Sequence, residues 1–375
     1  MKTRFSSTAS SVSRVLPAVC LLAAAALFTP GVKAQAPVST VFATGLHYPR
    51  GLAVGPDGAL YVAEAGLPGA SVSTVGQCTQ VPSPLGPYKG GMTSRISRID
   101  ATGNRTTVAD GLPSAQSATG AVVGAAAIAF VDDRMYVLLQ GSGCSHGHAG
   151  TANGIARVNP DGTWELVADL SAFWKANPVA SPEADDFEPD GDPYSLVSVG
   201  DDLYVVEANH GELDRVVLDD DGENDGHGAR IERVVDFSKT EGHAVPTTAV
   251  FHHGRFYVAN LDVFPVVPGS SKVWKVSPNG AISRWAGGLS AVLGLAFVEG
   301  SLYALETTTA AGPPTPRTGR IVRVSPSGVT PVVTGLFFPT AMIHGPGRAL
   351  YVSNNGFGPP GLGEILRVEL PPGPH

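Results

Sequence analysis

Residues 140–148 read QGSGCSHGH and place three metal-binding side chains close together. Cys144 precedes His146 by two positions and His148 by four. Thiolate and imidazole are the ligands that zinc and copper prefer. The same cysteine can instead form a disulfide, so the chemistry of this segment depends on the fold that holds it.

The first 34 residues have the pattern of a secretory signal peptide. Lys2, Arg4 and Arg14 precede an apolar run at 15–28, and GVKAQA follows with small residues that predict cleavage after Ala34. The run is short for a membrane span and no comparable run follows it, so we expect no membrane-spanning segment. We therefore expect a secreted or periplasmic protein, with the mature domain at 35–375.

The mature chain is acidic and keeps two cysteines. The whole chain has 25 Lys and Arg against 33 Asp and Glu, and the signal peptide contains four of the basic residues and no acid, which leaves 21 against 33, a net charge of −12. This balance, without basic clusters, argues against nucleic acid and anionic membranes as partners. Loss of Cys20 leaves Cys78 and Cys144, which predict one disulfide in an oxidising compartment.

An internal repeat predicts the fold. A turn followed by an apolar, an aromatic and a small apolar residue occurs six times, with the tyrosines about 46 to 75 residues apart. A short apolar run precedes each copy, and most copies are followed by two strand-like runs around a polar turn. Four-stranded units at this spacing are typical of a β-propeller. The six copies are DGALYVAE, DDRMYVLLQ, GDDLYVVE, HGRFYVAN, EGSLYALE and GRALYVSN.

We therefore predict an all-β chain, a six-bladed β-propeller of four-stranded antiparallel blades. The last unit ends at GEILRVEL without a fourth strand, while VSTVFATG at 38–45 resembles a fourth strand without a unit before it. The N-terminal strand should thus complete the last blade and leave no open sheet edge.

Long connections are predicted on one face of this propeller. The turns between the first and second strands are all tight, whereas the long loops join the second strand to the third, or one blade to the next. A short helix is expected at LSAFWKANP in the longest link. Long loops on a rigid scaffold usually bind ligands or hold catalytic groups, so this is the predicted functional face. The long segments are 66–93, 141–153, 171–192, 261–270, 307–318 and 355–363.

The two mature cysteines fall in loops of adjacent blades on this face. A Cys78–Cys144 disulfide is the favoured interpretation, and metal ligation by Cys144, His146 and His148 remains the alternative.

A polar residue recurs at the end of the second strand. It is Glu64, Glu207, Asn260, Glu306 or Asn354, with Leu139 in blade two. We expect these side chains to accept backbone N–H groups of a neighbouring link. The alternative is a ring of ligands at the mouth of the central channel.

Polar residues that occur in a single blade are the better candidates for binding. They include the acidic set Asp185, Asp186, Glu188, Asp190 and Asp192. The predicted ligand-binding residues are His47, Tyr48, Arg50, His146, His148, Asp190, Asp192, Tyr194, Glu207, His210, His243, Asp262 and Asn355.

One acidic turn on the opposite face is a candidate calcium site. LDDDGENDGHG at 218–228 offers several oxygen ligands at the spacing calcium uses, but it lacks the closing glutamate of an EF-hand. An ordinary solvated turn is the alternative, so no cofactor is certain and calcium is the one candidate. The ligands would be Asp219, Asp221, Glu223, Asn224 and Asp225.

Several stretches resemble the ScyD/ScyE family of secreted bacterial propellers related to NHL-repeat proteins. They are YPRGLAVGPDGALYVAEAG, GPYKGGMTSRISRIDATG, DGTWELVADLSAFWKANP, DPYSLV and LYVVEANHGELDRV. The resemblance covers nearly the whole mature chain and implies an exported six-bladed propeller. It implies no general catalytic mechanism.

Two classes of function follow from these observations. The first is a monomeric exported propeller that binds a small molecule, a glycan or a protein through its loop-rich face. The alternative is a metal-dependent propeller enzyme at the channel mouth, either a lactonase-like hydrolase or a lyase. A zinc lyase would need His47, His210 and His243 to converge. A lactonase would need carboxylates at the inner-strand entrances, where the chain has Arg50, Ala126, Tyr194, Thr247, Leu293 and Thr340.

Overall fold

A computed structural model of the chain describes Met1, residues 36–218 and residues 229–371. All of the predicted signal peptide except Met1 therefore lies outside the described residues. The candidate calcium ligands Asp219, Asp221, Glu223, Asn224 and Asp225 lie outside them as well. Among the described helices, none has the length and apolar character needed to cross a bilayer.

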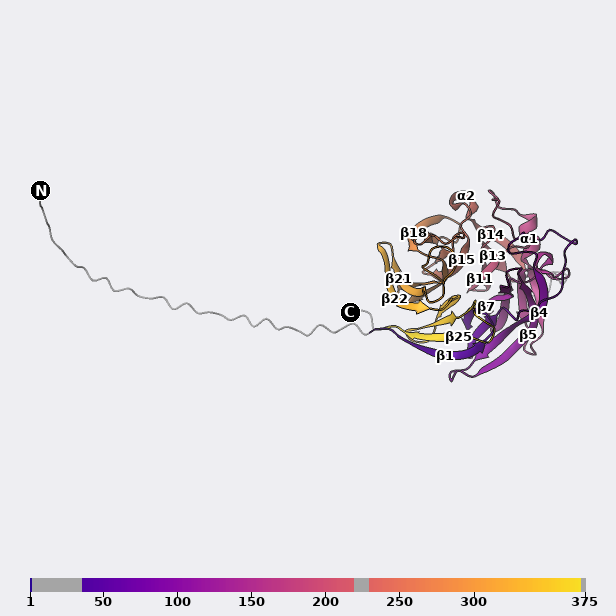
Figure 1. Cartoon of the computed structure of the whole chain (residues 1–375), viewed down its shortest axis with the longest axis horizontal. Helices are drawn as coiled ribbons and strands as arrows, with labels where there is room; N and C mark the ends of the chain where they lie inside the picture. The colour runs from indigo at the N-terminus through magenta and orange to yellow at the C-terminus, as the bar shows by residue number, and fades with distance from the viewer. Residues whose placement is uncertain (2–35, 219–228, 372–375) are drawn as a thin grey trace. The chain divides into compact units, whose positions relative to one another are not determined.

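Six antiparallel sheets form a ring, which confirms the predicted six-bladed β-propeller (Figure 1). Each inner strand contacts the inner strands of the two neighbouring blades, and the sixth contacts the first. The inner strands of blades one to six are β2 (Pro49–Val54), β7 (Ala125–Val131), β11 (Pro193–Val199), β15 (Pro246–His252), β19 (Val292–Val298) and β23 (Ala341–His344).

The repeated aromatic motif forms the second strand of every blade. Its tyrosines lie between blades, where most are buried and pack against apolar side chains of the next blade. This burial explains why the motif recurs, since each blade must cover both of its faces. The second strands are β3 (Leu60–Glu64), β8 (Arg134–Leu139), β12 (Asp202–Glu207), β16 (Arg255–Asn260), β20 (Ser301–Glu306) and β24 (Ala349–Asn354).

The third strand of each blade pairs with the second in antiparallel register. The third strands are β4 (Lys89–Ile99), β9 (Gly154–Val158), β13 (Glu212–Val217), β17 (Ser271–Val276), β21 (Gly319–Ser325) and β25 (Gly363–Glu369).

The fourth strands form the outer edge of the blades. Blade one differs from the prediction, because its third and fourth strands are long and the fourth also pairs with a fifth strand, β6 (Val122–Val123). The fourth strands are β5 (Arg105–Gln116), β10 (Trp164–Asp169), β14 (Arg230–Asp236), β18 (Ile282–Leu289), β22 (Gly328–Leu336) and, in blade six, β1 (Val38–Leu46).

The two ends of the domain close the ring, as the sequence predicts. Strand β1 pairs with β25, with Val41 opposite Leu366, and Figure 1 shows the indigo β1 alongside the yellow β25. Blade six is thus built from both ends of the described domain and has four strands.

The recurring polar residues fix the links that enter each blade, which confirms their expected structural role. Backbone N–H groups of His47, Asp192, Ser290 and Phe337 donate to Glu64, Glu207, Glu306 and Asn354 respectively, at 2.6 to 3.0 Å. Asn260 instead donates to the carbonyl oxygen of Ala244, at 2.8 Å. In blade two, where Leu139 replaces the polar residue, the backbone N–H of Gln140 binds the carbonyl oxygen of Gly124.

The loop-rich face also contains short helical segments. The expected helix is present as α1 (Leu170–Ala176). Asp169 is its N-cap residue, and the Asp169 carboxylate accepts a hydrogen bond from the backbone N–H of Ala172. A second helix, α2 (Ser238–Glu241), lies in the next link, and a 3-10 turn, η1 (Cys144–His146), lies in the loop of blade two.

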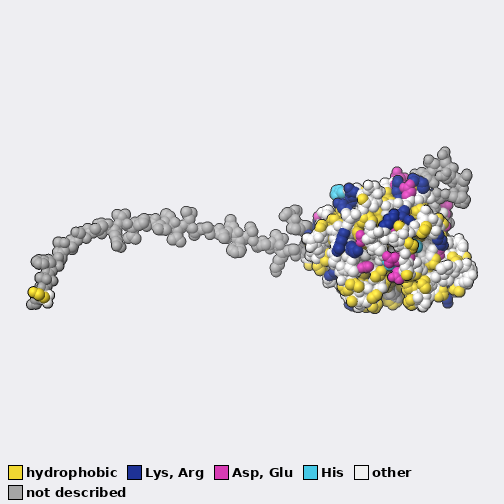
Figure 2. Space-filling model, turned by 90° about the horizontal axis from the view of Figure 1, so that it is seen from above, with side chains coloured by type: hydrophobic (Ala, Val, Ile, Leu, Met, Phe, Trp, Pro, Cys, Tyr) yellow, Lys and Arg dark blue, Asp and Glu magenta, His cyan; other side chains and the backbone are white. Residues whose placement is uncertain are grey.

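On the face seen in Figure 2, basic and acidic side chains are intermixed with hydrophobic ones and form no continuous basic band.

Candidate functional site

A disulfide joins Cys78 in the loop of blade one to Cys144 in η1 of blade two, as predicted. The two Cα atoms are 6.3 Å apart. His146 and His148 do not converge on the sulfur atoms: His146 faces a cavity, and His148 Nε2 lies 2.9 Å from the carbonyl oxygen of Ser114. The three side chains therefore do not form a metal half-site.

A cavity of about 540 Å³ opens on the loop-rich face, and a smaller cavity of about 130 Å³ continues it toward the channel. We call the two together the mouth pocket. They share a wall that includes Gln140 and Asp192. The upper wall is mainly apolar and aromatic, with Tyr88, Phe187 and Phe264, whereas the lower wall contains Arg50 and Tyr194.

Arg50 provides a cation in the lower part of the mouth pocket. Its side chain donates to the carbonyl oxygens of Gly356 at 2.7 Å and Val122 at 3.0 Å, and lies 4.7 Å from the ring centroid of Phe357. Burial lowers the pKa of Arg50, and the nearby Tyr194, Tyr48 and Asp192 oppose that shift. An arginine stays protonated under such conditions, so this pocket presents a fixed positive charge.

Asp192 provides a carboxyl group next to this cation. Burial raises the pKa of Asp192 to about 6, although a 2.5 Å hydrogen bond from Gln140 Nε2 opposes the shift. Gln140 lies one position beyond the end of β8, directly after Leu139, which occupies the strand-end position that is polar in the other blades. A carboxyl group with a pKa near neutrality can accept and return a proton at physiological pH.

Tyr194 forms the floor of the mouth pocket. Its hydroxyl donates to the carbonyl oxygen of Thr340 at 3.0 Å, and the two residues come from blades three and six, on opposite sides of the ring. Burial raises the pKa of Tyr194 to about 12, so the phenol remains a hydrogen-bond donor.

A second polar group lies in the upper wall. Glu188 Oε2 and His146 Nε2 are 3.5 Å apart, without the alignment of a hydrogen bond, and this carboxyl oxygen is buried without a hydrogen-bond partner. Burial raises the pKa of Glu188 well above its usual range and lowers the pKa of His146 to about 4. Burial therefore disfavours the charged form of each side chain.

Asp190 sets the orientation of the His146 ring. Ser145 donates its hydroxyl proton to Asp190 at 2.6 Å, and Lys175 also donates to Asp190. Because the serine proton is used there, Ser145 Oγ can only accept from His146 Nδ1, 3.2 Å away. The network thus assigns the proton to Nδ1 and leaves Nε2 unprotonated toward Glu188.

Two further predicted residues complete the rim of the mouth pocket. His243 Nδ1 lies 2.8 Å from Asp186, and Asp262 occupies a left-handed backbone position with φ 69°. The mouth pocket therefore brings together six of the predicted ligand-binding residues. They are Arg50, His146, Asp192, Tyr194, His243 and Asp262.

The other seven predicted residues do not line the mouth pocket. Most of them hold links or loops through their own hydrogen bonds: Asn355, for example, donates to the carbonyl oxygen of Leu362 at 2.7 Å. Because His47 and His210 lie outside the mouth pocket, they do not form a three-imidazole site with His243. The seven are His47, Tyr48, His148, Asp190, Glu207, His210 and Asn355.

Glu207, His210 and Glu212 form the one group of potential metal ligands found among the described residues. Their oxygens are already used: Glu207 accepts backbone N–H groups of Asp192, Asn209 and His210, and Glu212 pairs with Arg233 through both of its oxygens. The arginine supplies the positive charge that a metal would bring, so this group fits a metal poorly.

Several residues that line the mouth pocket are absent from the predicted ligand-binding set. The signal for Gln140 was present, since it follows the one strand end at which the repeat loses its polar residue. Glu188 stands in the acidic set, but the spacing of five carboxylates does not show which of them line the mouth pocket. The aromatic residues lie in loops without periodicity. These residues are Tyr88, Gln140, Phe187, Glu188, Asn209, Phe264 and Phe357.

The fold is similar to that of several solved enzymes at low sequence identity. An oxidoreductase from Thermus thermophilus, described as a glucose dehydrogenase, matches with a TM-score of 0.53 and 17% identity, over 88% of this chain and 99% of that chain. A gluconolactonase from Xanthomonas campestris matches with a TM-score of 0.51 and 12% identity, over 89% of each chain. The apo form of the aldose sugar dehydrogenase from Escherichia coli matches with a TM-score of 0.52 and 15% identity, over 89% of this chain and 99% of that chain.

No protein-family model and no curated protein sequence matches the chain. At these identities the similarity to solved structures establishes the β-propeller fold and does not assign an activity. An activity has to follow from the residues of the site.

Proposed function

We propose that this chain is an exported propeller hydrolase that opens a lactone or a similar cyclic ester of a small polyhydroxylated molecule in the mouth pocket. The observation that carries the proposal is Asp192, a buried carboxyl group with a pKa of about 6 in the cavity that Arg50 also lines. A gluconolactonase and two sugar dehydrogenases share the fold, which supports a small sugar-derived substrate. The resemblance to the ScyD/ScyE family supports export, with removal of residues 1–34.

The chemistry uses water as the second reactant. Ionised Asp192 takes a proton from the attacking water, whose oxygen forms a bond to the ester carbonyl carbon. Arg50 stabilises the negative charge that develops on the carbonyl oxygen. The bond to the ring oxygen then breaks, and that oxygen receives the proton from Asp192, so one water is consumed and one hydroxy acid is formed.

The upper wall provides recognition. Glu188 has a buried carboxyl oxygen without a hydrogen-bond partner, so it offers a hydrogen bond to a substrate hydroxyl group. Tyr88 and Phe264 give flat apolar surfaces for one face of a ring.

A metal does not fit the mouth pocket well. Arg50 would repel a cation bound beside Asp192, and one Asp192 oxygen already accepts from Gln140. We therefore derive no step through a metal, in contrast to the metal-dependent enzyme expected from the sequence as the alternative.

The proposal is tested by proton release from D-glucono-1,5-lactone and from dihydrocoumarin, an aromatic lactone, measured by pH-stat. We expect hydrolysis above the uncatalysed rate, and a loss of at least about 100-fold in kcat/KM in Asp192→Asn. Asp201→Asn, at an exposed turn on the opposite face, is the matched control. Equal rates for Asp192→Asn and the wild type, or no hydrolysis of either lactone, would reject the hydrolase.

A second function, binding without turnover, is favoured by the apolar side chains exposed on the same face. Three of them, Val263, Phe264 and Val267, lie in one loop beside the mouth pocket. Such side chains suit a glycan or a protein partner. If Asp192→Asn and the wild type bind a lactone equally well and neither hydrolyses it, binding becomes the better description.

A further inference from the structure

The carboxyl groups of the mouth pocket are concentrated in its larger cavity, which we call the upper cavity. Its wall contains no Lys or Arg side chain among the described residues. Arg50 lines the smaller cavity instead. The upper cavity is thus acidic and has no fixed cation in its own wall. Its four carboxyl groups belong to Asp185, Glu188, Asp192 and Asp262.

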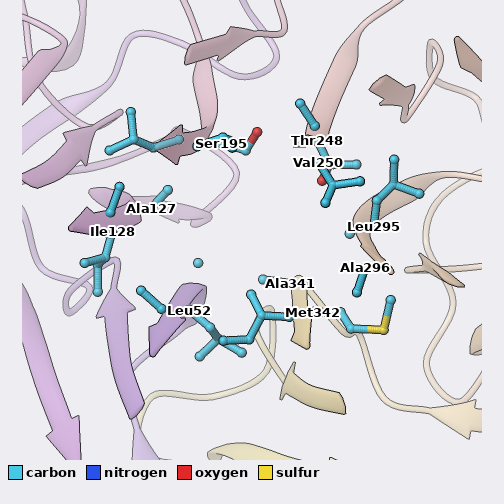
Figure 3. Close-up of a pocket in the computed structure, with 18 of the residues that line it drawn as sticks. Leu52, Ala127, Ile128, Ser195, Thr248, Val250, Leu295, Ala296, Ala341 and Met342 are labelled. Carbon is cyan, nitrogen blue, oxygen red and sulfur yellow. The ribbon is translucent and has the colours of Figure 1, made fainter. Parts of the chain in front are cut away.

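The adjoining part of the central channel lacks such groups. Tyr194 lines the smaller cavity and also a cavity of about 530 Å³ in the channel. Figure 3 shows side chains around this channel cavity, among them Leu52, Val250 and Met342. None of the described residues that line it is Asp, Glu, Lys or Arg. A charged ligand therefore finds carboxyl groups in the mouth pocket and not in the channel cavity.

Glu188 is the carboxyl group of the upper cavity that lacks a partner. It is 6% exposed, and its Oε2 atom is buried without a hydrogen bond. His146 Nε2 lies 3.5 Å away and is unprotonated, because the contact with Ser145 holds the ring proton on Nδ1. Burial, and then the charges of Asp192 and Glu207, raise the pKa of Glu188. An ammonium N–H would give Oε2 a charge-assisted hydrogen bond and favour the ionised carboxylate.

Three aromatic side chains line the same cavity. Tyr88 is buried, and its ring centroid lies 4.6 Å from that of His146. Phe187 directly precedes Glu188, and Phe264 enters from the loop of blade four. The face of an aromatic ring attracts an organic cation, and the ring also packs against the apolar part of such a ligand.

The carboxyl groups of the upper cavity suit an organic cation better than a metal ion. A metal ion needs several ligand atoms that converge on one point. Among the described residues, the one group of side chains that converges in this way is Glu207, His210 and Glu212, and none of these lines the upper cavity.

We propose that the upper cavity binds a small organic cation, an ammonium group on an apolar or aromatic body, with the ammonium group at Glu188. The volume of about 540 Å³ is within the range of small-molecule sites. A neutral ligand would gain no attraction from the carboxyl groups, and an anion would be repelled by them. The inference concerns the pocket of the proposed hydrolase, but binding needs no turnover, so the two can fail separately.

Three ligands with one aromatic body test the role of charge. 2-Phenylethylamine carries an ammonium group, 2-phenylethanol has a hydroxyl group in its place, and phenylacetate carries a carboxylate. In calorimetric titrations of the wild type at pH 7.5, we expect the amine to bind at least about tenfold more tightly than the alcohol, because a charge-assisted hydrogen bond is the stronger one. Phenylacetate should bind more weakly than the alcohol.

Variants of the wall test where the cation binds. Glu188→Gln keeps the size of the side chain but removes its charge, and should weaken binding of 2-phenylethylamine at least about tenfold. Phe264→Ala removes one ring and should weaken it about threefold. Glu165→Gln makes the same exchange as Glu188→Gln at a side chain that is 52% exposed on β10, and should bind like the wild type.

Three results would overturn the proposal. They are equal binding of the amine and the alcohol, binding of phenylacetate as tight as that of the amine, and unchanged affinity for the amine in a folded Glu188→Gln. If Glu188→Gln does not fold, the three ligands still decide the question in the wild type. Hydrolysis of a lactone without binding of the amine would reject this inference alone, whereas binding of the amine without hydrolysis would reject only the hydrolase.

Discussion

The hydroxyl of Tyr194 donates to the carbonyl oxygen of Thr340 across the central channel, at 3.0 Å. The bond connects blades three and six, which are opposite each other in the ring, and Tyr194 lines both the mouth pocket and a cavity of about 530 Å³ in the central channel. A single side chain thus lies between the pocket that contains Arg50 and the rest of the central channel.

Removal of this hydroxyl should destabilise the fold modestly. Tyr194→Phe keeps the ring but leaves the Thr340 carbonyl oxygen without its donor, so we expect the free energy of unfolding to fall by about 1 kcal/mol. The control is Tyr257→Phe, because the Tyr257 hydroxyl has no hydrogen-bond partner among the described residues. Urea unfolding curves measure both. Equal losses in the two variants would show that the bond across the channel contributes nothing.

Asp192 should make stability fall as pH rises. Its pKa is about 6 in the folded protein against an ordinary value of 3.8, so the folded state binds more protons than the unfolded state between these values. Its contribution to the free energy of unfolding is therefore fully present well below pH 4 and is lost as the pH rises through 6. The full contribution amounts to about 3 kcal/mol.

Asp192→Asn removes that titration. Urea unfolding at pH 4 and pH 7 should show that the variant loses about 2 kcal/mol less than the wild type between these two values, because part of the titration lies below pH 4. Asp201→Asn should follow the wild type at both. A pH dependence in Asp192→Asn identical to that of the wild type would mean that the carboxyl group titrates normally.

The sequence predicts the scaffold far better than the site. Blade number, ring closure and the role of the strand-end residues follow from features that recur, because each blade solves the same burial problem and repeats the same residues. Glu64 and Glu306 have the same role for this reason, each accepting a backbone N–H from the link that enters its blade.

The site depends on residues that occur once. Whether Glu188 or its neighbour Asp186 lines the mouth pocket is decided by how the link at 171–192 packs on the loops of other blades, and no local pattern encodes that packing. Phe264 and Phe357 reach the mouth pocket from blades four and six. Even the disulfide could be placed on the functional face only after the repeat had assigned the two cysteines to adjacent blades.

The disulfide should contribute substantially to stability. Cys78 and Cys144 are 66 residues apart, and a crosslink of that span restricts the unfolded chain by about 4 kcal/mol. Cys78→Ser combined with Cys144→Ser should lower the free energy of unfolding by this amount, and reductant should lower that of the wild type equally. Reductant should leave the double variant unchanged. A double variant as stable as the oxidised protein would contradict the prediction.

Glu306 tests whether the strand-end residues are structural. It is fully buried, accepts the backbone N–H of Ser290 at 2.6 Å and pairs with Arg320. Glu306→Ala leaves a buried N–H and a partly buried arginine without partners, so we expect a loss of about 3 kcal/mol in the free energy of unfolding.

Glu299→Ala is the matched control for that loss. Glu299 also pairs with an arginine, Arg348, but its side chain is 59% exposed, so its removal should cost no more than about 0.5 kcal/mol. Glu306→Gln, which keeps an acceptor for Ser290 but loses the charge, should lie between the two. Urea unfolding of the three variants decides the matter: if Glu306→Ala is as stable as Glu299→Ala, the link into blade five is held by its other contacts. The recurring carboxylate would then need a functional explanation, as a ligand at the mouth of the channel.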